Sequence, residues 1–235
     1  MIAALAGLVA GFVLANSINR TELSTLRAEN EQLKKAPAAA PGSSGGNLTQ
    51  EEIDATIARA DQNPGDFLTQ RNVGIAIYRY GAVKQDQNLI RQSVRILDRA
   101  VALRPDDYEV ILSLGNANFD IGYFAKENQS LVKARDFYAK ALAAKPDNVD
   151  VRTDVGLTYF LETPPDYAKA ETEFRRSLDK DPKHEKTLQY MVQALIKQSK
   201  SAEAADYLQR LRTVNPQNES IGELTSMLST TAPAG

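Results

Sequence analysis

The 235-residue chain contains no cysteine and no tryptophan, and His184 is its only histidine. Without cysteine there are no disulfides, no thiol catalysis and no cysteine-ligated zinc. A single histidine also excludes a metal site that draws several histidines from one chain. We therefore expect neither a metal nor a cofactor.

The chain also lacks a charge excess and catalytic motifs. Its formal net charge is −2, which gives no basic footprint for nucleic acid. No phosphate-binding glycine loop, nucleophile elbow or metal-ligand spacing occurs in it. The acidic pairs Glu51-Glu52 and Asp106-Asp107 fall at predicted helix starts, where the helix dipole favours negative charge. His184 follows the sequence DPK and is expected to be a solvated turn residue. No catalytic residue is predicted, and we expect the protein not to be an enzyme.

The first 18 residues carry no charged side chain and would form about 27 Å of helix, enough to cross a hydrocarbon core. A secretory signal with a cleavage site near residues 13–15 is the alternative. No basic residue precedes the apolar run and a heptad pattern follows it, which favours a single-pass membrane anchor over residues 1–19. The basic residues that follow it are Arg20, Arg27, Lys34 and Lys35. They favour a cytoplasmic over a periplasmic solenoid, and basic residues upstream of the apolar run would reverse this.

Residues 20–35 predict a short coiled coil, because four residues occupy heptad positions a, d, a and d: Leu23, Leu26, Asn30 and Leu33. An asparagine at position a fixes the register of parallel two-stranded coils. The anchor would add a dimer face of small residues four apart: Ala3, Gly7, Gly11 and Ala15. A solvated juxtamembrane helix above an alanine-rich span fits this stretch equally well. Residues 36–47, rich in proline, alanine, glycine and serine, are typical of a linker.

A repeat dominates the rest of the chain. Gly74, Gly115 and Gly156 are each 41 residues apart, and so are Tyr78, Phe119 and Phe160. A proline closes each of four helix–turn–helix patterns: Pro105, Pro146, Pro182 and Pro216. The pattern predicts a helical array over residues 48–230, with units at about 67–107, 108–148, 149–184 and 185–218, end helices, and a tail at 231–235.

These units resemble the tetratricopeptide repeat over about residues 64–218. The first helix carries a large apolar residue before the glycine, as in Leu114-Gly115, and the second carries a small–large–small pattern, as in Ala134, Tyr138 and Ala141. The resemblance implies an all-α fold, a right-handed α-solenoid of helical hairpins, preceded here by the transmembrane helix. In such a solenoid the glycine lies where the two helices of a unit cross, and stacking of units buries their shared face.

The first two units are longer than the 34 residues of the family by seven, at residues 84–90 and 126–132. Seven residues are two helical turns. The two inserts resemble each other and keep the apolar face of the second helix in phase. We expect them to extend the second helix at its start and to form no catalytic loop.

The resemblance also implies a binding surface, because ligands of this family lie in a concave groove lined by the first helix of each unit. Mapped by register, nine residues are expected to line it: Arg71, Ile75, Tyr78, Leu112, Asn116, Phe119, Thr153, Leu157 and Phe160. The aromatic row would suit an extended or helical peptide. The alternative is that these rings pack between units as core.

Two functions fit these features. The first is a membrane-anchored protein–protein interaction scaffold with a protein or peptide partner. The resemblance to anchored tetratricopeptide proteins permits a role in assembling an envelope complex, cytochrome c or pili. The second is an oligomeric structural subunit, held in a larger membrane complex by the anchor, the coil and the solenoid together.

Overall fold

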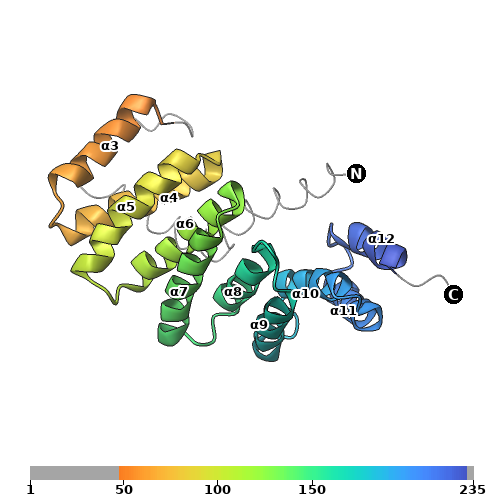
Figure 1. Cartoon of the computed structure of the whole chain (residues 1–235). Coiled ribbons are helices and arrows are strands. Elements are labelled where there is room, and N and C mark those ends of the chain that lie inside the picture. The colour runs from red at the N-terminus through yellow and green to blue at the C-terminus, as the bar shows by residue number, and fades with distance from the viewer. Residues whose placement is uncertain (1–47, 232–235) are drawn as a thin grey trace. The chain divides into compact units, whose positions relative to one another are not determined.

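The computed structural model describes residues 48–231. As predicted, this part of the chain is all-helical, with ten α-helices and no strand (Figure 1). The chain divides into two compact units, the first ending at Leu103 and the second beginning at Arg104. We call them unit 1 and unit 2 and describe each separately.

Unit 1 contains α3 (Gln50–Gln62), α4 (Phe67–Lys84) and α5 (Gln87–Leu103). A capping box starts α3, since Glu52 N donates to Thr49 Oγ1 (3.2 Å) and Thr49 N donates to Glu52 Oε2 (2.8 Å). The hairpin α4–α5 and α3 share one apolar core, whose buried members are Ile53, Ala60, Val73, Ile77, Leu89 and Ile96.

Unit 2 contains three hairpins in succession and a final helix. Their helices are α6 (Tyr108–Ala125) and α7 (Asn128–Ala144), α8 (Val149–Leu161) and α9 (Tyr167–Lys180), α10 (Glu185–Lys197) and α11 (Ser201–Val214), and α12 (Ile221–Thr231). The second helix of each hairpin contacts the first helix of the next, α7 against α8 and α9 against α10. The helix α12 lies against α10 and α11 and covers the end of the array.

The repeated glycine lies at the helix crossing of the first three hairpins, as the repeat predicts. A Cβ at Gly74 would lie 2.7 Å from Leu97, and one at Gly115 would lie 2.7 Å from the Tyr138 ring. A Cβ at Gly156 would collide with the Phe174 ring. The opposing side chains are fully buried, so they have no room to move away.

The added residues of the first two hairpins do not lie where the sequence predicted, at the start of the second helix alone. The first helices α4 and α6 have 18 residues each, against 13 in α8 and α10. The second helices α5 and α7 have 17 each, against 14 in α9 and α11. The added residues therefore lengthen both helices, and the prediction that they extend only the second was wrong.

A second pair of glycines explains why both helices grow. Gly81 and Gly122 follow the crossing glycines by seven residues. A Cβ at Gly81 would lie 3.0 Å from Leu89 Cβ, and one at Gly122 would lie 3.0 Å from the backbone nitrogen of Leu131. The helices of a long hairpin thus stay in close contact up to their turn, and neither can be extended alone.

Within residues 48–231, no helix is both long and apolar enough to cross a membrane. Several predictions concern sequence outside these residues. They are the anchor at 1–19 with its face of Ala3, Gly7, Gly11 and Ala15, the coil at 20–35, the linker at 36–47 and most of the tail.

Candidate functional site

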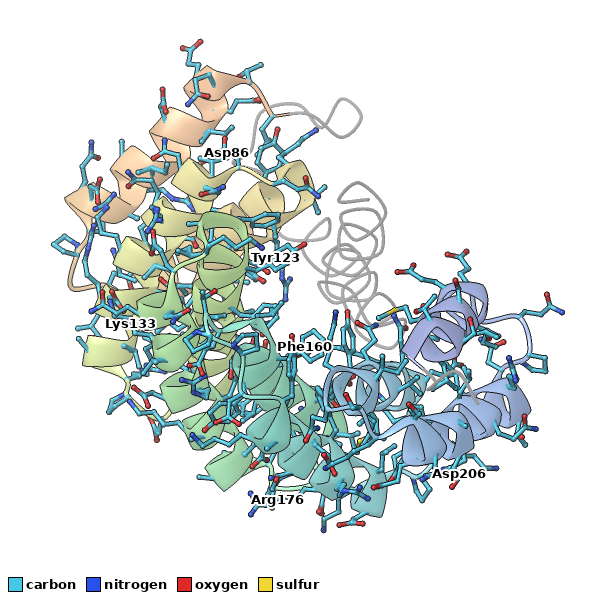
Figure 2. The ribbon with its side chains drawn as sticks, turned by 45° about the vertical axis from the view of Figure 1, so that its right-hand side comes forward. Asp86, Tyr123, Lys133, Phe160, Arg176 and Asp206 are labelled. Atoms are coloured by element: carbon cyan, nitrogen blue, oxygen red, sulfur yellow. The ribbon has the colours of Figure 1, made fainter. Side chains whose placement is uncertain are left out.

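The first helices of the three hairpins in unit 2 present one common face. Figure 2 shows Tyr123 and Phe160 on this side of unit 2, and Arg176 of α9 and Asp206 of α11 on the opposite side. We call it the α6–α8–α10 face and define it by six residues: Asp120, Tyr123, Asp154, Phe160, Lys186 and Tyr190.

An ion pair joins two helices of this face. Lys186 Nζ on α10 donates to Asp154 Oδ1 on α8 at 2.6 Å. The two side chains are only 17% and 7% exposed. A buried charge of this kind needs its partner, because water no longer solvates it. The pair therefore fixes α10 against α8 at one position.

Aromatic rings gather one to two turns further along the same helices. Phe160 of α8 meets Tyr190 of α10 edge-on, with ring centroids 6.0 Å apart, and meets Tyr167 at 5.2 Å. Burial raises the pKa of Tyr190, and the nearby Asp154 and Tyr123 add to the rise. Its hydroxyl consequently stays protonated and can donate a hydrogen bond at any physiological pH.

The helix α6 contributes an acid and a ring one turn apart. Asp120 is 6% exposed, and Tyr123 is half-buried, with Lys126 Nζ lying 4.7 Å from its ring centroid. Burial raises the pKa of Tyr123 as well. Within residues 48–231, no group of three histidine, aspartate or glutamate side chains is placed to hold a metal ion. The face offers flat rings, tyrosine hydroxyl donors and paired charges.

The nine residues expected to line the groove divide between the two units and between surface and core. Arg71, Ile75 and Tyr78 belong to α4 of unit 1, where Ile75 is 8% and Tyr78 6% exposed. Arg71 is half-buried and donates from Nη1 to Asn72 Oδ1 at 3.0 Å.

The other six belong to unit 2, and only three of them keep accessible surface: Leu112, Asn116 and Phe160. Phe119, Thr153 and Leu157 are at most 2% exposed. Their expected place on a groove wall is corrected, because these side chains are core. Thr153 shows the reason most clearly, since its hydroxyl is bonded to the carbonyl oxygen of Val149 and to Ser177 and Thr187.

Sequence reasoning missed five of the six residues that define the face: Asp120, Tyr123, Asp154, Lys186 and Tyr190. One signal was available. Asp154 stands two residues before the crossing Gly156, and Tyr190 stands two residues before Val192, which takes the glycine position in the next unit. A polar residue at the same repeat position in successive first helices marks the side that α8 and α10 share.

His184 also differs from expectation. It occupies the N-cap of α10, is half-buried, and uses both ring nitrogens in hydrogen bonds. Its Nδ1 lies 2.6 Å from Thr187 Oγ1, and its Nε2 lies 3.1 Å from Asp150 Oδ1. The expectation of a solvated turn residue was wrong because Asp150 lies 34 residues earlier in the chain and meets His184 only in the fold.

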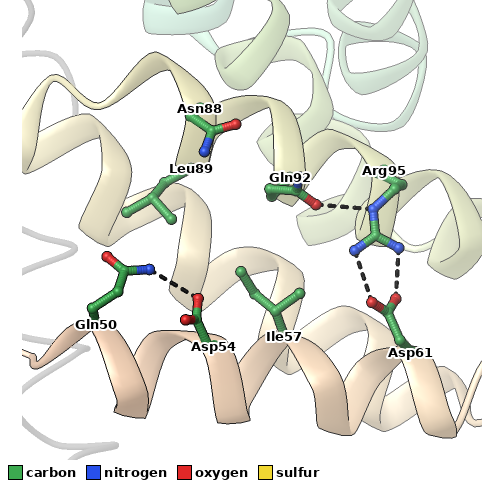
Figure 3. A pocket seen from close by; sticks show the side chains of 8 residues that line it. All are labelled: Gln50, Asp54, Ile57, Asp61, Asn88, Leu89, Gln92 and Arg95. Carbon is green, nitrogen blue, oxygen red and sulfur yellow. Dashed lines mark hydrogen bonds and ion pairs between the residues drawn. The ribbon is translucent and has the colours of Figure 1, made fainter.

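Unit 1 has a separate open cleft of about 440 Å³ between α3 and α5 (Figure 3). Arg95 closes one end through two hydrogen bonds to Asp61, and Gln50 donates to Asp54 toward the other end. The hydrogen bonds from Arg95 and Arg99 lower the pKa of Asp61 to about 2. This carboxylate therefore serves to tie α3 to α5.

Known structures share this architecture. MamA from Desulfovibrio magneticus RS-1 is 18% identical with a TM-score of 0.57, over 73% of this chain and 88% of that one. PilW, described as a widely conserved type IV pilus biogenesis factor, is 12% identical with a TM-score of 0.57, over 77% of this chain and 78% of that one. A thermophilic TPR protein of Thermus thermophilus is 15% identical with a TM-score of 0.51, over 77% and 91%. No protein-family model matches the sequence, and neither does any curated protein.

Proposed function

We propose that this chain, an all-helical repeat protein with a tetratricopeptide-like fold, is a protein-interaction scaffold whose partner binds on the α6–α8–α10 face. The observation that carries the proposal is the juxtaposition of the Asp154–Lys186 pair with the Phe160–Tyr190 ring pair. Rigid rings offer contact area at little cost in conformational entropy, and the tyrosine hydroxyls supply directional hydrogen bonds.

The partner we infer is a helix or an extended segment with apolar side chains and at least one hydrogen-bond acceptor. The apolar side chains would contact Tyr123 and Phe160, both half-buried and on the same side of unit 2. The acceptor would use the protonated hydroxyl of Tyr123. Leu112 and Asn116, which are also half-buried on α6, extend this surface toward the start of that helix.

Membrane anchoring and an assembly role are further parts of the proposal. The uncharged residues 1–18 support an anchor, and the fold likeness to a pilus biogenesis factor supports assembly of an envelope complex. The heptad pattern of residues 20–35 favours the second candidate, an oligomeric structural subunit. A right-handed solenoid built from both units belongs to the same proposal.

Site-specific photo-crosslinking in cells tests the face. A benzoylphenylalanine in place of Tyr123 should capture a partner protein, whereas the same residue in place of Tyr207 should not. Tyr207 is a matched control, because it is also a half-buried tyrosine but lies on α11 beside Arg210, with 4.7 Å between the guanidinium carbon and the ring centroid. Equal capture at the two positions, or capture at Tyr207 alone, would refute the proposed face.

Deletion of residues 1–35 separates the two candidate functions. A scaffold should retain the protein that is crosslinked at Tyr123, because the face lies wholly in unit 2. A structural subunit should no longer be crosslinked to that protein, because the anchor and the coil would hold the subunit in its complex.

A further inference from the structure

The link between α8 and α9 runs from residue 162 to residue 166 and is longer than the two-residue links of α4–α5 and α6–α7. We call it the α8–α9 loop. Phe160 lies just before it and Tyr167 just after it, and the two rings are in contact with centroids 5.2 Å apart. The backbone groups of such a loop have no helical partners, so its shape depends on the other groups that bond to them.

Asn128, at the start of α7, bonds to the middle of this loop. Its Nδ2 donates to the carbonyl oxygen of Thr163 at 2.7 Å, and Thr163 N donates to Asn128 Oδ1 at 3.0 Å. One side-chain amide therefore satisfies both backbone groups of one loop residue. Among short side chains only asparagine has this donor and this acceptor side by side, since aspartate lacks the donor and alanine lacks both.

Arg135 bonds to the α8 side of the loop, about two turns further along α7. Its Nη1 donates to Thr158 Oγ1 at 3.1 Å, and its Nη2 donates to the Glu162 carboxylate. The guanidinium carbon lies 4.2 Å from the Tyr159 ring centroid. The Arg135 and Glu162 side chains are only 15% and 18% exposed, so salt and water screen this pair less than a surface pair.

The two residues at the end of α8 point in different directions. The Tyr159 ring lies against Arg135 of α7, and the Tyr159 carbonyl oxygen accepts from Asp166 N at 3.0 Å, which closes the loop. Phe160 is rotated from Tyr159 by about 100° around the helix. Its ring contacts Tyr190 of α10, with centroids 6.0 Å apart. The contacts on the α7 side of α8 therefore determine where the Phe160 ring lies on the opposite side.

We propose that Asn128 and Arg135 are positioning residues for partner binding. By holding the α8–α9 loop against α7, they fix the Phe160 ring in its place on the α6–α8–α10 face. Both act through Phe160 and do not themselves belong to the face. The proposal rests on the function proposed above, and it gives a second helix, α7, a part in a surface that first helices present.

Hydrogen exchange of the full chain gives the first test. Asn128→Ala should speed exchange of the Thr163 amide by about two- to tenfold, which corresponds to the usual net contribution of one hydrogen bond. The Asp166 amide is more informative, because it bonds to Tyr159 and not to Asn128. Its exchange should also become faster if the whole loop is released. Gln129→Ala changes the exposed residue next to Asn128 and should leave both amides unchanged.

NMR of the aromatic rings gives the second test. The Phe160 and Tyr190 rings are close enough in the native chain for a nuclear Overhauser effect between them. Asn128→Ala and Arg135→Lys should each weaken this signal. Lysine keeps the positive charge but lacks the planar fork that bonds to two groups and stacks on a ring. The control is Lys133→Ala, which removes an exposed cation from the same helix and should leave the signal intact.

Partner capture gives the third test, with benzoylphenylalanine in place of Tyr123 as above. Capture should fall severalfold in Asn128→Ala and in Arg135→Lys, at a temperature where both variants are fully folded. The melting temperature of Asn128→Ala should stay near that of the native chain, because Asn128 is exposed and exposed truncations cost little stability. The two control variants should capture the partner as the native chain does.

Three results would overturn the proposal. The first is an unchanged Asp166 exchange rate together with an unchanged Phe160–Tyr190 signal in both variants. The second is full capture by variants whose ring contact is lost. The third is a loss of capture that merely follows a lower melting temperature. The first two tests involve no partner, so they judge the positioning of Phe160 even if the native chain captures nothing at Tyr123, a result that would refute the proposed function.

Discussion

The long hairpins α4–α5 and α6–α7 are held together differently from the short hairpins α8–α9 and α10–α11. Each long hairpin has two glycines in its first helix, seven residues apart, and a two-residue link between its helices. Gly156 is the only glycine in either short hairpin, and none lies in α10–α11. The long hairpins depend on close approach of backbones, whereas the short ones depend more on side-chain contacts.

Glu171 of α9 shows what those side-chain contacts are. It is 8% exposed and accepts hydrogen bonds from Arg175, Lys200 and Gln198, which lie on α9 and in the link between α10 and α11. Burial alone would raise the pKa of this carboxyl, but the donors, Lys200 foremost, lower it. The buried carboxylate of Glu171 thus joins the two short hairpins, as that of Asp154 does through its pair with Lys186.

The largest effect should come from the crossing glycine of a long hairpin. Gly115→Leu should lower the free energy of unfolding by about 3 kcal/mol or more, because a Cβ would already lie 2.7 Å from the fully buried Tyr138 ring. Gly222→Leu is the control, since no atom lies within 4 Å of a Cβ built there. Urea unfolding followed by circular dichroism measures both. Equal midpoints for the two variants would show that the crossing is not tight.

The second glycine should matter somewhat less. Gly122→Ala should cost about 1–3 kcal/mol, because the new methyl group would meet Leu131 Cδ2 at 2.6 Å and its backbone nitrogen at 3.0 Å. Gly222→Ala should instead stabilise its helix by about 0.5–1 kcal/mol, the usual gain for alanine over glycine. If thermal melts show Gly122→Ala to be as stable as the native chain, close contact between the helices at Gly122 does not hold the long hairpin together.

Glu171→Gln tests the short hairpins. The loss should be about 1 kcal/mol, modest because Arg175 keeps its pair with Glu203 and is 43% exposed. The carboxylate contributes stability above its unfolded pKa, and this is lost as the pH falls through the lower folded value. The stability of variant and native chain should therefore converge in acid. A constant difference between about pH 7 and about pH 3 would contradict the role of the charge.

The smallest effect should come from the turn of a long hairpin. Gln85 ends α4 in the left-handed conformation, with φ at 54°. Gln85→Gly should stabilise the chain by about 0.5–1 kcal/mol. The left-handed backbone strains a residue that has a Cβ, and relief of this strain outweighs the greater conformational freedom of glycine in the unfolded chain. Lys126→Gly, at φ 57°, should behave alike. A lower melting temperature in both variants would show that the turn tolerates its side chains without strain.

The crossing glycines could be predicted from the sequence because the same residue type recurs at the same place in the first three units. The distribution of the added residues could also have been predicted, since Gly81 and Gly122 share the 41-residue spacing. The burial of Thr153 and the place of His184 could not, because they depend on contacts between helices more than 20 residues apart. The burial of Phe119 could not be predicted either, because a ring four residues past the glycine points to the border between core and surface.

The matched long hairpins have a consequence for how the gene can change. Both repeat their crossing glycine, second glycine and left-handed turn residue at intervals of 41 residues. A loss or duplication of 41 codons in this stretch would join like positions, so each hairpin would keep a glycine at its helix crossing. A change of any other length would set a glycine of one helix opposite the wrong side chain of its partner. Insertions and deletions in this part of the gene should therefore add or remove whole repeats, because the close approach of the two helices fixes their register.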